Sequence, residues 1–239
     1  MDVNKAIRYV MEDKQWISKL IIGILLSVLG FLIIPALILQ GYLVKIIRHV
    51  MGGSWSSLPE WDDWGGLLRD GFFVTVAQFL YTLPFIILII ISIAATGGIA
   101  GLSGSEDIAA VAATGGGLLM FCLIILFAIA LLFLTPALLI QYAIKDDFSA
   151  LFRLGEVTDI IRNNMADILV AFLVSIAAVF AISLITGVLS LIPCLGWIAA
   201  FLIGLAIGPY ISFVTSHLYG QIAAKILGNK AGGPMTPMA

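Results

Sequence analysis

The residues with the clearest chemical potential form an acidic, tryptophan-rich run: Trp55, Pro59, Glu60, Trp61, Asp62, Asp63 and Trp64. Neighbouring carboxylates can share a hard cation or dock a basic partner, whereas indole rings prefer the headgroup level of a membrane. Two hypotheses follow. The run is either a loop anchored by tryptophan whose carboxylates cap the next helix, as Asp70 also could, or a functional loop that docks a basic partner or holds a cation weakly. No calcium-binding spacing is present, so we expect no metal and no cofactor.

A second pattern bears on catalysis. Gly101-Leu-Ser103-Gly104 and His217-Leu-Tyr-Gly220 resemble the serine and histidine motifs of rhomboid proteases. A serine and its base must lie within hydrogen-bond contact, but these two are expected at opposite sides of the bilayer. The His/Asn oxyanion elements of that family are also missing. We therefore predict no catalytic residue and no enzyme.

A family resemblance rests on the same region. The helix beginning Gly41-Tyr-Leu and the run Pro59-Glu-Trp-Asp-Asp-Trp64 resemble a prokaryotic membrane-protein family, domain of unknown function 4013. The resemblance implies a polytopic membrane protein. It implies no known activity, so no functional residue can be transferred from it.

Composition places the chain in a bilayer. Hydrophobic residues make up 62%, charged residues 11%, and the mean hydropathy is +1.15, whereas a soluble domain is about 25% charged. The net charge of −2 offers no basic patch for nucleic acid. Cys122 and Cys194 lie far apart in apolar surroundings, which predicts small packing residues rather than metal ligands.

The elements that must position these residues are apolar spans. Four full transmembrane helices are predicted, at residues 72–95, 118–142, 168–191 and 198–222, with a loop at 96–117 and a short turn at 192–197. Helical patterns at 2–16 and 148–165 predict two amphipathic helices, which either pack on the protein or lie in the membrane interface. Residues 17–47 would form one helix of about 46 Å, against a hydrocarbon core of about 30 Å.

The cations decide how residues 17–47 are expected to fold. All twelve Lys and Arg residues lie in four segments, 2–19, 45–69, 145–162 and 225–230. Cytoplasmic segments are enriched in these residues. A hairpin turning near Gly30–Pro35 places all twelve on the cytoplasmic side, whereas a single span places four or eight outside. We favour an N-terminal membrane hairpin over a single span, with a cytoplasmic C-terminus.

An internal repeat supports this arrangement. Pro35-Ala-Leu-Ile-Leu-Gln-Gly-Tyr-Leu-Val-Lys45 recurs as Pro136-Ala-Leu-Leu-Ile-Gln-Tyr-Ala-Ile-Lys145, with one residue deleted. We predict a single membrane domain over 1–227 with a weak repeat, 1–95 and 136–227, followed by a disordered tail at 228–239.

Small residues recur at every fourth position of the last span. Such residues let helices approach closely in lipid, so the stripe predicts either packing within one protomer or a seam between copies. Its members are Gly196, Ala200, Gly204, Gly208, Ser212, Ser216, Gly220 and Ala224.

The sequence thus predicts an all-α polytopic integral membrane protein, multi-pass in the cell membrane of a prokaryote. No Asp, Glu, Lys or Arg falls in the central part of any span, and such groups are what ion-coupled transporters use. The favoured function is a scaffold or accessory protein without catalytic activity. The alternative is a transporter or channel for an uncharged or lipidic solute. Expected partners are membrane lipids and other membrane proteins or a second copy, not nucleic acid.

Overall fold

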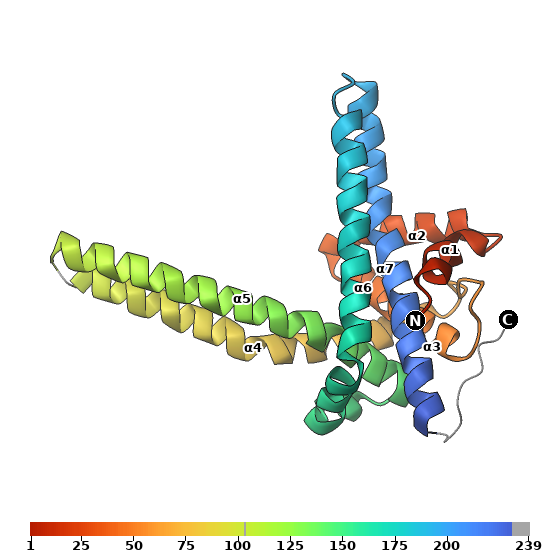
Figure 1. The fold of residues 1–239 in the computed structure, drawn as a ribbon, viewed down its shortest axis with the longest axis horizontal. Helices are drawn as coiled ribbons and strands as arrows, with labels where there is room; N and C mark the ends of the chain where they lie inside the picture. The colour runs from red at the N-terminus through yellow and green to blue at the C-terminus, as the bar shows by residue number, and fades with distance from the viewer. Residues whose placement is uncertain (103, 231–239) are drawn as a thin grey trace. The chain divides into compact units, whose positions relative to one another are not determined.

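The computed structural model describes residues 1–102 and 104–230 of the chain. Within this part the regular elements are all helical, which confirms the all-α prediction. In chain order they are α1 Val3–Glu12, α2 Trp16–Val28, the 3-10 helix η1 Leu29–Leu32, α3 Ile34–Met51, α4 Trp64–Leu102, α5 Glu106–Lys145, the 3-10 helix η2 Phe148–Phe152, α6 Leu154–Leu189 and α7 Leu195–Lys230 (Figure 1). Helix α7 thus includes the start of the expected tail, and residues 231–239 lie outside the described part.

Five of the described helices, α3 to α7, are long and apolar enough to cross a membrane. Three of the four predicted spans fall inside α4, α5 and α7, and the span at 168–191 matches α6 except for its last two residues, so a polytopic membrane protein is confirmed. A further pair, α1 and the joined segment Trp16–Leu32, passes the same test together but is bent by 97° at a break. That pair is no straight span.

Residues 17–47 do not form one helix. Helix α2 ends at Val28, the chain makes one 3-10 turn, and Ile33 adopts a positive φ of 67° before α3 begins. Pro35 lies in the first turn of α3, where its missing N–H costs no hydrogen bond. The break expected near Gly30–Pro35 is confirmed.

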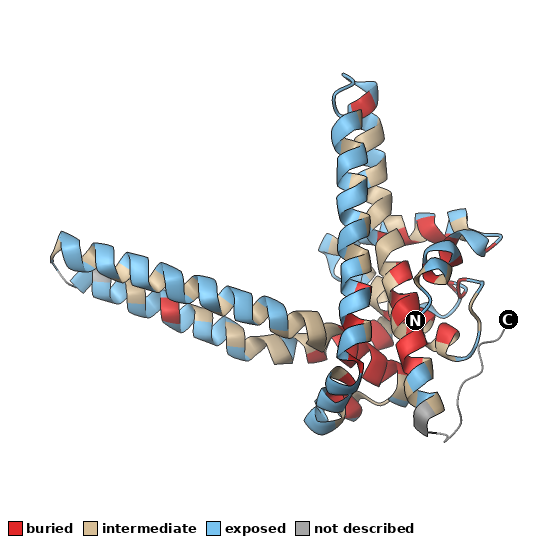
Figure 2. Cartoon of the chain, in the orientation of Figure 1, coloured by how far each residue is buried: buried red, intermediate tan, exposed pale blue. Residues whose placement is uncertain are grey.

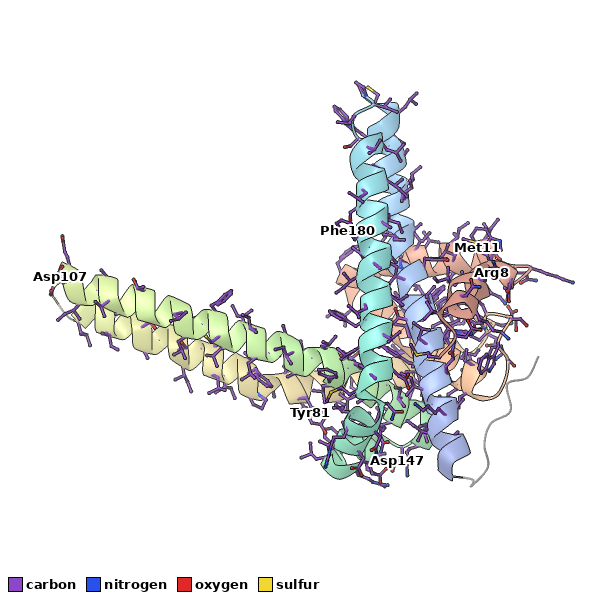
Figure 3. All side chains as sticks on the ribbon, in the orientation of Figure 1. Arg8, Met11, Tyr81, Asp107, Asp147 and Phe180 are labelled. Atoms are coloured by element: carbon purple, nitrogen blue, oxygen red, sulfur yellow. The ribbon has the colours of Figure 1, made fainter. Side chains whose placement is uncertain are left out.

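The chain forms two compact units: unit 1, Met1–Thr75 with Pro136–Ala239, and unit 2, Val76–Thr135. Unit 1 has a core of buried aromatic and aliphatic side chains gathered around the C-terminal part of α7 (Figure 2), among them Tyr9, Tyr42, Phe213 and Leu218. The first part of α7 and the facing part of α6 are largely exposed, and Phe180 projects outward from α6 (Figure 3). The single domain at 1–227 and its repeat remain predictions.

Two glycines let α3 and α4 approach closely in unit 1. A Cβ added to Gly41 would lie 2.6 Å from the carbonyl carbon of Leu67, and one added to Gly71 would lie 2.7 Å from that of Leu37. Gly41 therefore faces the carbonyl group of Leu67, four residues before Gly71, and Gly71 faces that of Leu37, four residues before Gly41. Side chains at either position would push the two helices apart.

Unit 2 pairs the second part of α4 with the first part of α5. The prediction of a loop at residues 96–117 is wrong, because α4 continues to Leu102 and α5 begins at Glu106. The small residues there serve helix packing: a Cβ on Gly116 would meet the side chain of Thr96. In lipid, backbone groups must be bonded within the helix, which favours helix over an open glycine-rich loop.

The second amphipathic segment is helical: it begins with η2 and continues as the part of α6 that precedes a kink. Residues 148–152 make η2, and α6 then runs from Leu154 into the span with one break at Asn164, whose φ and ψ are −129° and 20°. The Asn164 side chain donates to the Ile160 carbonyl at 3.1 Å. Two helical parts therefore meet at this kink, the polar one before Asn164 and the apolar one after it, and the amphipathic character of the first part stays a prediction.

Candidate functional site

The Trp–acidic loop, residues 52–63, folds back onto α2 and α3. The Trp61 ring stacks on that of Tyr42 with a centroid distance of 3.5 Å and an interplanar angle of 8°. The Tyr42 hydroxyl donates to the Pro59 carbonyl at 2.8 Å, and the Trp61 indole N–H donates to the Lys19 carbonyl at 3.2 Å. Trp61 and Pro59 are buried, so these two residues anchor the loop to its own protein.

A buried ion pair lies beneath the loop. The Lys19 ammonium is 2.9 Å from the Asp13 carboxylate and 2.6 Å from that of Glu60, and it donates to the Leu58 carbonyl at 2.8 Å. Burial acts to raise the pKa of Asp13, but bonds from Lys19 and from the backbone N–H groups of Gln15 and Leu58 outweigh it and lower that pKa. The loop is thus locked to the α1–α2 corner by charge as well as by packing.

The remaining carboxylates of the loop also have partners within the chain. Asp62 accepts from Lys45, and this bond holds the pKa of Asp62 below its usual value. Asp63 accepts from the Gly66 N–H at 2.9 Å, which is the helix-cap role that one hypothesis assigned to these carboxylates.

The tryptophans at the ends of the loop are more open. Trp64 begins α4 with 44% of its surface exposed. Trp55 is half-buried, with the Lys5 ammonium 5.0 Å above its ring. Together with the exposed Glu60, Asp62 and Asp63, they form the accessible edge of the loop. A docking role for this edge remains a prediction.

A second cluster centres on Asp70, which is buried inside α4 and does not cap it. Asp70 accepts from the Tyr142 hydroxyl at 2.9 Å and from Arg69 at 3.0 Å, and it also pairs with Arg48. Arg48 bridges onward to Asp146 at 2.8 Å. Sequence reasoning missed this cluster; the repeat, which aligns Tyr42 with Tyr142, was the one signal pointing to the tyrosine.

Contacts join three of the four cation-bearing segments on one face of unit 1, and the fourth lines a pocket together with the third. Lys19–Glu60 links the first segment to the second, and Arg48–Asp146 links the second to the third. The fourth lies close to the others: Lys225 lines one pocket with Glu156 and Asp159, and Gln221, one turn before Lys225 in α7, accepts from the Asp2 N–H at 2.7 Å. We call this surface the polar face. Groups in direct contact cannot lie on opposite sides of a bilayer, so these segments share one side of any membrane that unit 1 occupies.

The polar face contains a pocket of about 350 Å³ between the end of α5, the first part of α6 and the end of α7. Its lining mixes charges, amides and isoleucines. Gln141 donates to Glu156 at 2.7 Å on one wall, and Asp159 and Lys225 line other parts. Lys225 pairs with Asp167 at 2.7 Å. The lining can contact a small molecule that has both polar and apolar parts.

The small-residue stripe divides along α7. Gly220 packs tightly, since a Cβ there would lie 2.6 Å from Val50 Cβ, and Ser216 is buried. Gly204 and Gly208 have open space around the Cβ position. Gly196 faces the end of α6, at the Leu189 carbonyl. Both hypotheses for the stripe, packing in one protomer and a seam between copies, stay open.

The cysteines and the serine and histidine candidates lie in different settings. Cys122 and Cys194 are exposed, so the described part of the chain does not enclose them as the small packing residues that the sequence predicted. Ser103 lies outside the described residues, while His217 is fully buried against Tyr9 at 4.4 Å between ring centroids. In the described part of the chain, no group of three His, Cys, Asp or Glu side chains is placed to hold a metal ion.

Comparison with known proteins adds the family. No curated protein and no solved structure matches the chain. The family model described as "Protein of unknown function (DUF4013)" matches residues 22–191, which include the break after α2, the Trp–acidic loop, the Asp70 cluster and the first helix of the α6–α7 pair. The chain therefore belongs to the DUF4013 family.

Proposed function

We propose that this protein is an integral membrane scaffold or accessory protein without catalytic activity, whose polar face lies on the cytoplasmic side of a prokaryotic cell membrane. One observation carries the proposal: the segments that hold all twelve Lys and Arg residues lie together on one face of unit 1, three joined by ion pairs and the fourth beside the third in one pocket, while residues 76–135 contain none. Cations are enriched on the cytoplasmic side. The C-terminal end of α7 belongs to the same face.

The polar face offers charge for a partner. Arg8, Lys14 and Arg162 are exposed, and the described part of the chain supplies no ion pair to any of them. Most other cations on this face are already paired internally. Unpaired surface cations steer and orient an acidic partner, so the proposed scaffold binds an acidic segment of another protein there.

Orientation is tested by cysteine labelling. Asp2→Cys and Glu106→Cys are made separately after replacing Cys122 and Cys194 with serine, and intact cells are treated with a membrane-impermeant maleimide. We expect the Glu106→Cys variant to label from outside and the Asp2→Cys variant to label only after the membrane is opened. Labelling of both variants from the same side overturns the proposal.

Partner binding is tested by pull-down in gentle detergent with mass spectrometry of proteins and lipids. The variant Arg8→Glu/Arg162→Glu reverses two unpaired cations and is expected to lose the proteins that wild type captures. The matched control Glu106→Gln changes one charge outside the polar face and is expected to retain them. Identical capture by all three proteins overturns an acidic partner on the polar face.

The pocket favours a second candidate, a transporter or channel for an uncharged or lipidic solute. If this second candidate is correct, one lipid species co-purifies with wild type. The same lipid is depleted in the double variant Asp159→Leu/Lys225→Leu, which changes the pocket lining. An unchanged lipid profile counts against this candidate and leaves the scaffold.

A further inference from the structure

Helix α2 has one face turned toward the protein and one face that no described part of the chain covers. On the exposed face the apolar side chains are 48–58% exposed and recur at helical spacing. They are Ile17, Ile21, Leu25 and Val28. The opposite face is buried and consists of Lys19, Leu20, Gly23 and Leu26. Since Lys19 contacts the Trp–acidic loop, the exposed apolar face points away from the polar residues.

Helix α2 crosses α7 at a defined level. A Cβ on Gly23 would lie 2.9 Å from Cζ of Phe213 and 3.5 Å from Cβ of Pro209. Figure 1 shows α2 running across α7 rather than along it. The whole of α2 therefore stays near one level of α7, between residues 209 and 213.

That level can be converted into a depth. The apolar part of α7 begins at Leu195, which we take as one boundary of the hydrocarbon core of the bilayer. This core is about 30 Å thick and takes about 20 helical residues, so its boundary on the side of the polar face lies near residue 215. Pro209 and Phe213 then lie about 9 Å and 3 Å inside that boundary. In-plane amphipathic helices bury their apolar face about 5–10 Å deep, and the two depths on α7 bracket most of that range.

Helix α3 returns from this level to the polar face. Its Tyr42 ring is 5.3 Å from that of Phe213, and its Val50 packs at Gly220. From Tyr42 to Val50, α3 thus runs beside α7 from Phe213 to Gly220, in the same direction. The exposed turn before α3, where Phe31 is 77% exposed, joins two segments that begin and end on one side of the membrane.

We propose that α2 and η1 form an in-plane helix whose exposed apolar face is covered by phospholipid acyl chains of a single leaflet, the one on the side of the polar face. The occupant follows from continuity with the apolar surface of α6, where Ile176 and Val179 are exposed and the neighbouring Ser175 contacts Thr215 of α7, near the same level. The inference rests on the membrane placement in the proposed function. It adds that α2 does not cross the bilayer, so α4, α5, α6 and α7 are the crossing helices.

Depth measurement along α2 tests the proposal. Single cysteines replacing Ile17, Ile21, Leu25 and Val28, in protein lacking the two native cysteines, carry a nitroxide label. The full-length protein is reconstituted in vesicles of phosphatidylethanolamine and phosphatidylglycerol. Collision with oxygen and with a water-soluble nickel complex gives each depth by electron paramagnetic resonance. We expect four similar, shallow depths that differ by less than about 5 Å.

The control is the same measurement on α6 at Leu173, Phe180 and Val188, which are exposed. Depth there should pass through the bilayer centre, because 15 residues of helix advance about 22 Å. A steady change of about 16 Å from position 17 to 28 overturns the in-plane helix, as does full exposure of all four α2 labels to nickel. Exposure of the α6 labels to nickel would instead overturn the membrane placement itself.

Discussion

Replacing Gly41 by alanine tests the close approach of α3 and α4. The added Cβ would lie 2.6 Å from the Leu67 carbonyl carbon, and nearer still to its oxygen. Ordinary contact begins at 3.4 Å. The obstructing atoms belong to the backbone, so no side-chain rotation can relieve the overlap. The oxygen is the nearest atom, so the two helices must separate by about 1.5 Å.

The expected cost can be worked from this overlap. Overpacking costs about 1–3 kcal/mol, and a rigid backbone neighbour places Gly41→Ala near the upper end. Alanine gains about 1 kcal/mol over glycine within a helix. We therefore expect a net loss of about 2 kcal/mol in the free energy of unfolding. Gly71→Ala should lose a similar amount, because its Cβ meets the Leu37 carbonyl group in the same way.

The double variant sharpens the test. Both substitutions push apart the same helix pair, so separation caused by one reduces the cost of the other, and the double loss should be smaller than the sum. The assay is reversible unfolding in mixed micelles by titration with dodecyl sulfate. Gly97→Ala is the matched control in α4, where nothing lies within 4 Å of the Cβ position. The reasoning would be refuted if Gly41→Ala had the same free energy of unfolding as wild type, or if Gly97→Ala were destabilised.

Three further predictions concern the polar clusters and use the same unfolding assay. Lys19→Met leaves the buried Asp13 carboxylate without its cation and should cost about 3 kcal/mol; a loss below that of the exposed-site variant Glu60→Gln would contradict this. Because the pKa of Asp13 is lowered in the folded protein, its stabilisation is present at neutral pH and is lost as pH falls below about 4. Wild type should therefore lose more stability from pH 7 to pH 3 than Asp13→Asn, and equal losses would contradict the assignment. Tyr142→Phe removes one donor to Asp70 and should cost about 1.5 kcal/mol, whereas an unchanged midpoint would show that the bond contributes nothing.

The membrane architecture was predictable because it follows from local sequence. Apolar length located the four spans, and the Gly30–Pro35 break was visible from residues that interrupt helices. The loop predicted at 96–117 was wrong because a glycine-rich stretch usually indicates a loop. Its small size is used there for helix contact, as Gly116 and Thr96 show, and only the paired helix reveals that use.

The polar clusters were not predictable because their partners lie far apart in sequence. Asp70 pairs with Arg48 from α3 and accepts a hydrogen bond from Tyr142 of α5, and no spacing rule connects these three positions. The Trp–acidic loop was correctly singled out, but residue types alone could not reveal that Trp61 stacks on Tyr42. Contacts of this kind depend on how α3 and the loop meet, which local patterns do not encode.

The internal use of the loop changes where a partner should be sought. A docking loop needs free charge, yet Glu60 and Asp62 are paired with lysines and Asp63 caps α4. Ion pairs already formed within the chain must be broken before a partner can use them, which cancels much of any gain. The unpaired cations Arg8 and Arg162 carry no such cost. An acidic partner that approaches them would leave the Lys19 and Asp70 clusters intact, which is why the charge-reversal variants at these two positions are the sharpest probe of the proposed scaffold.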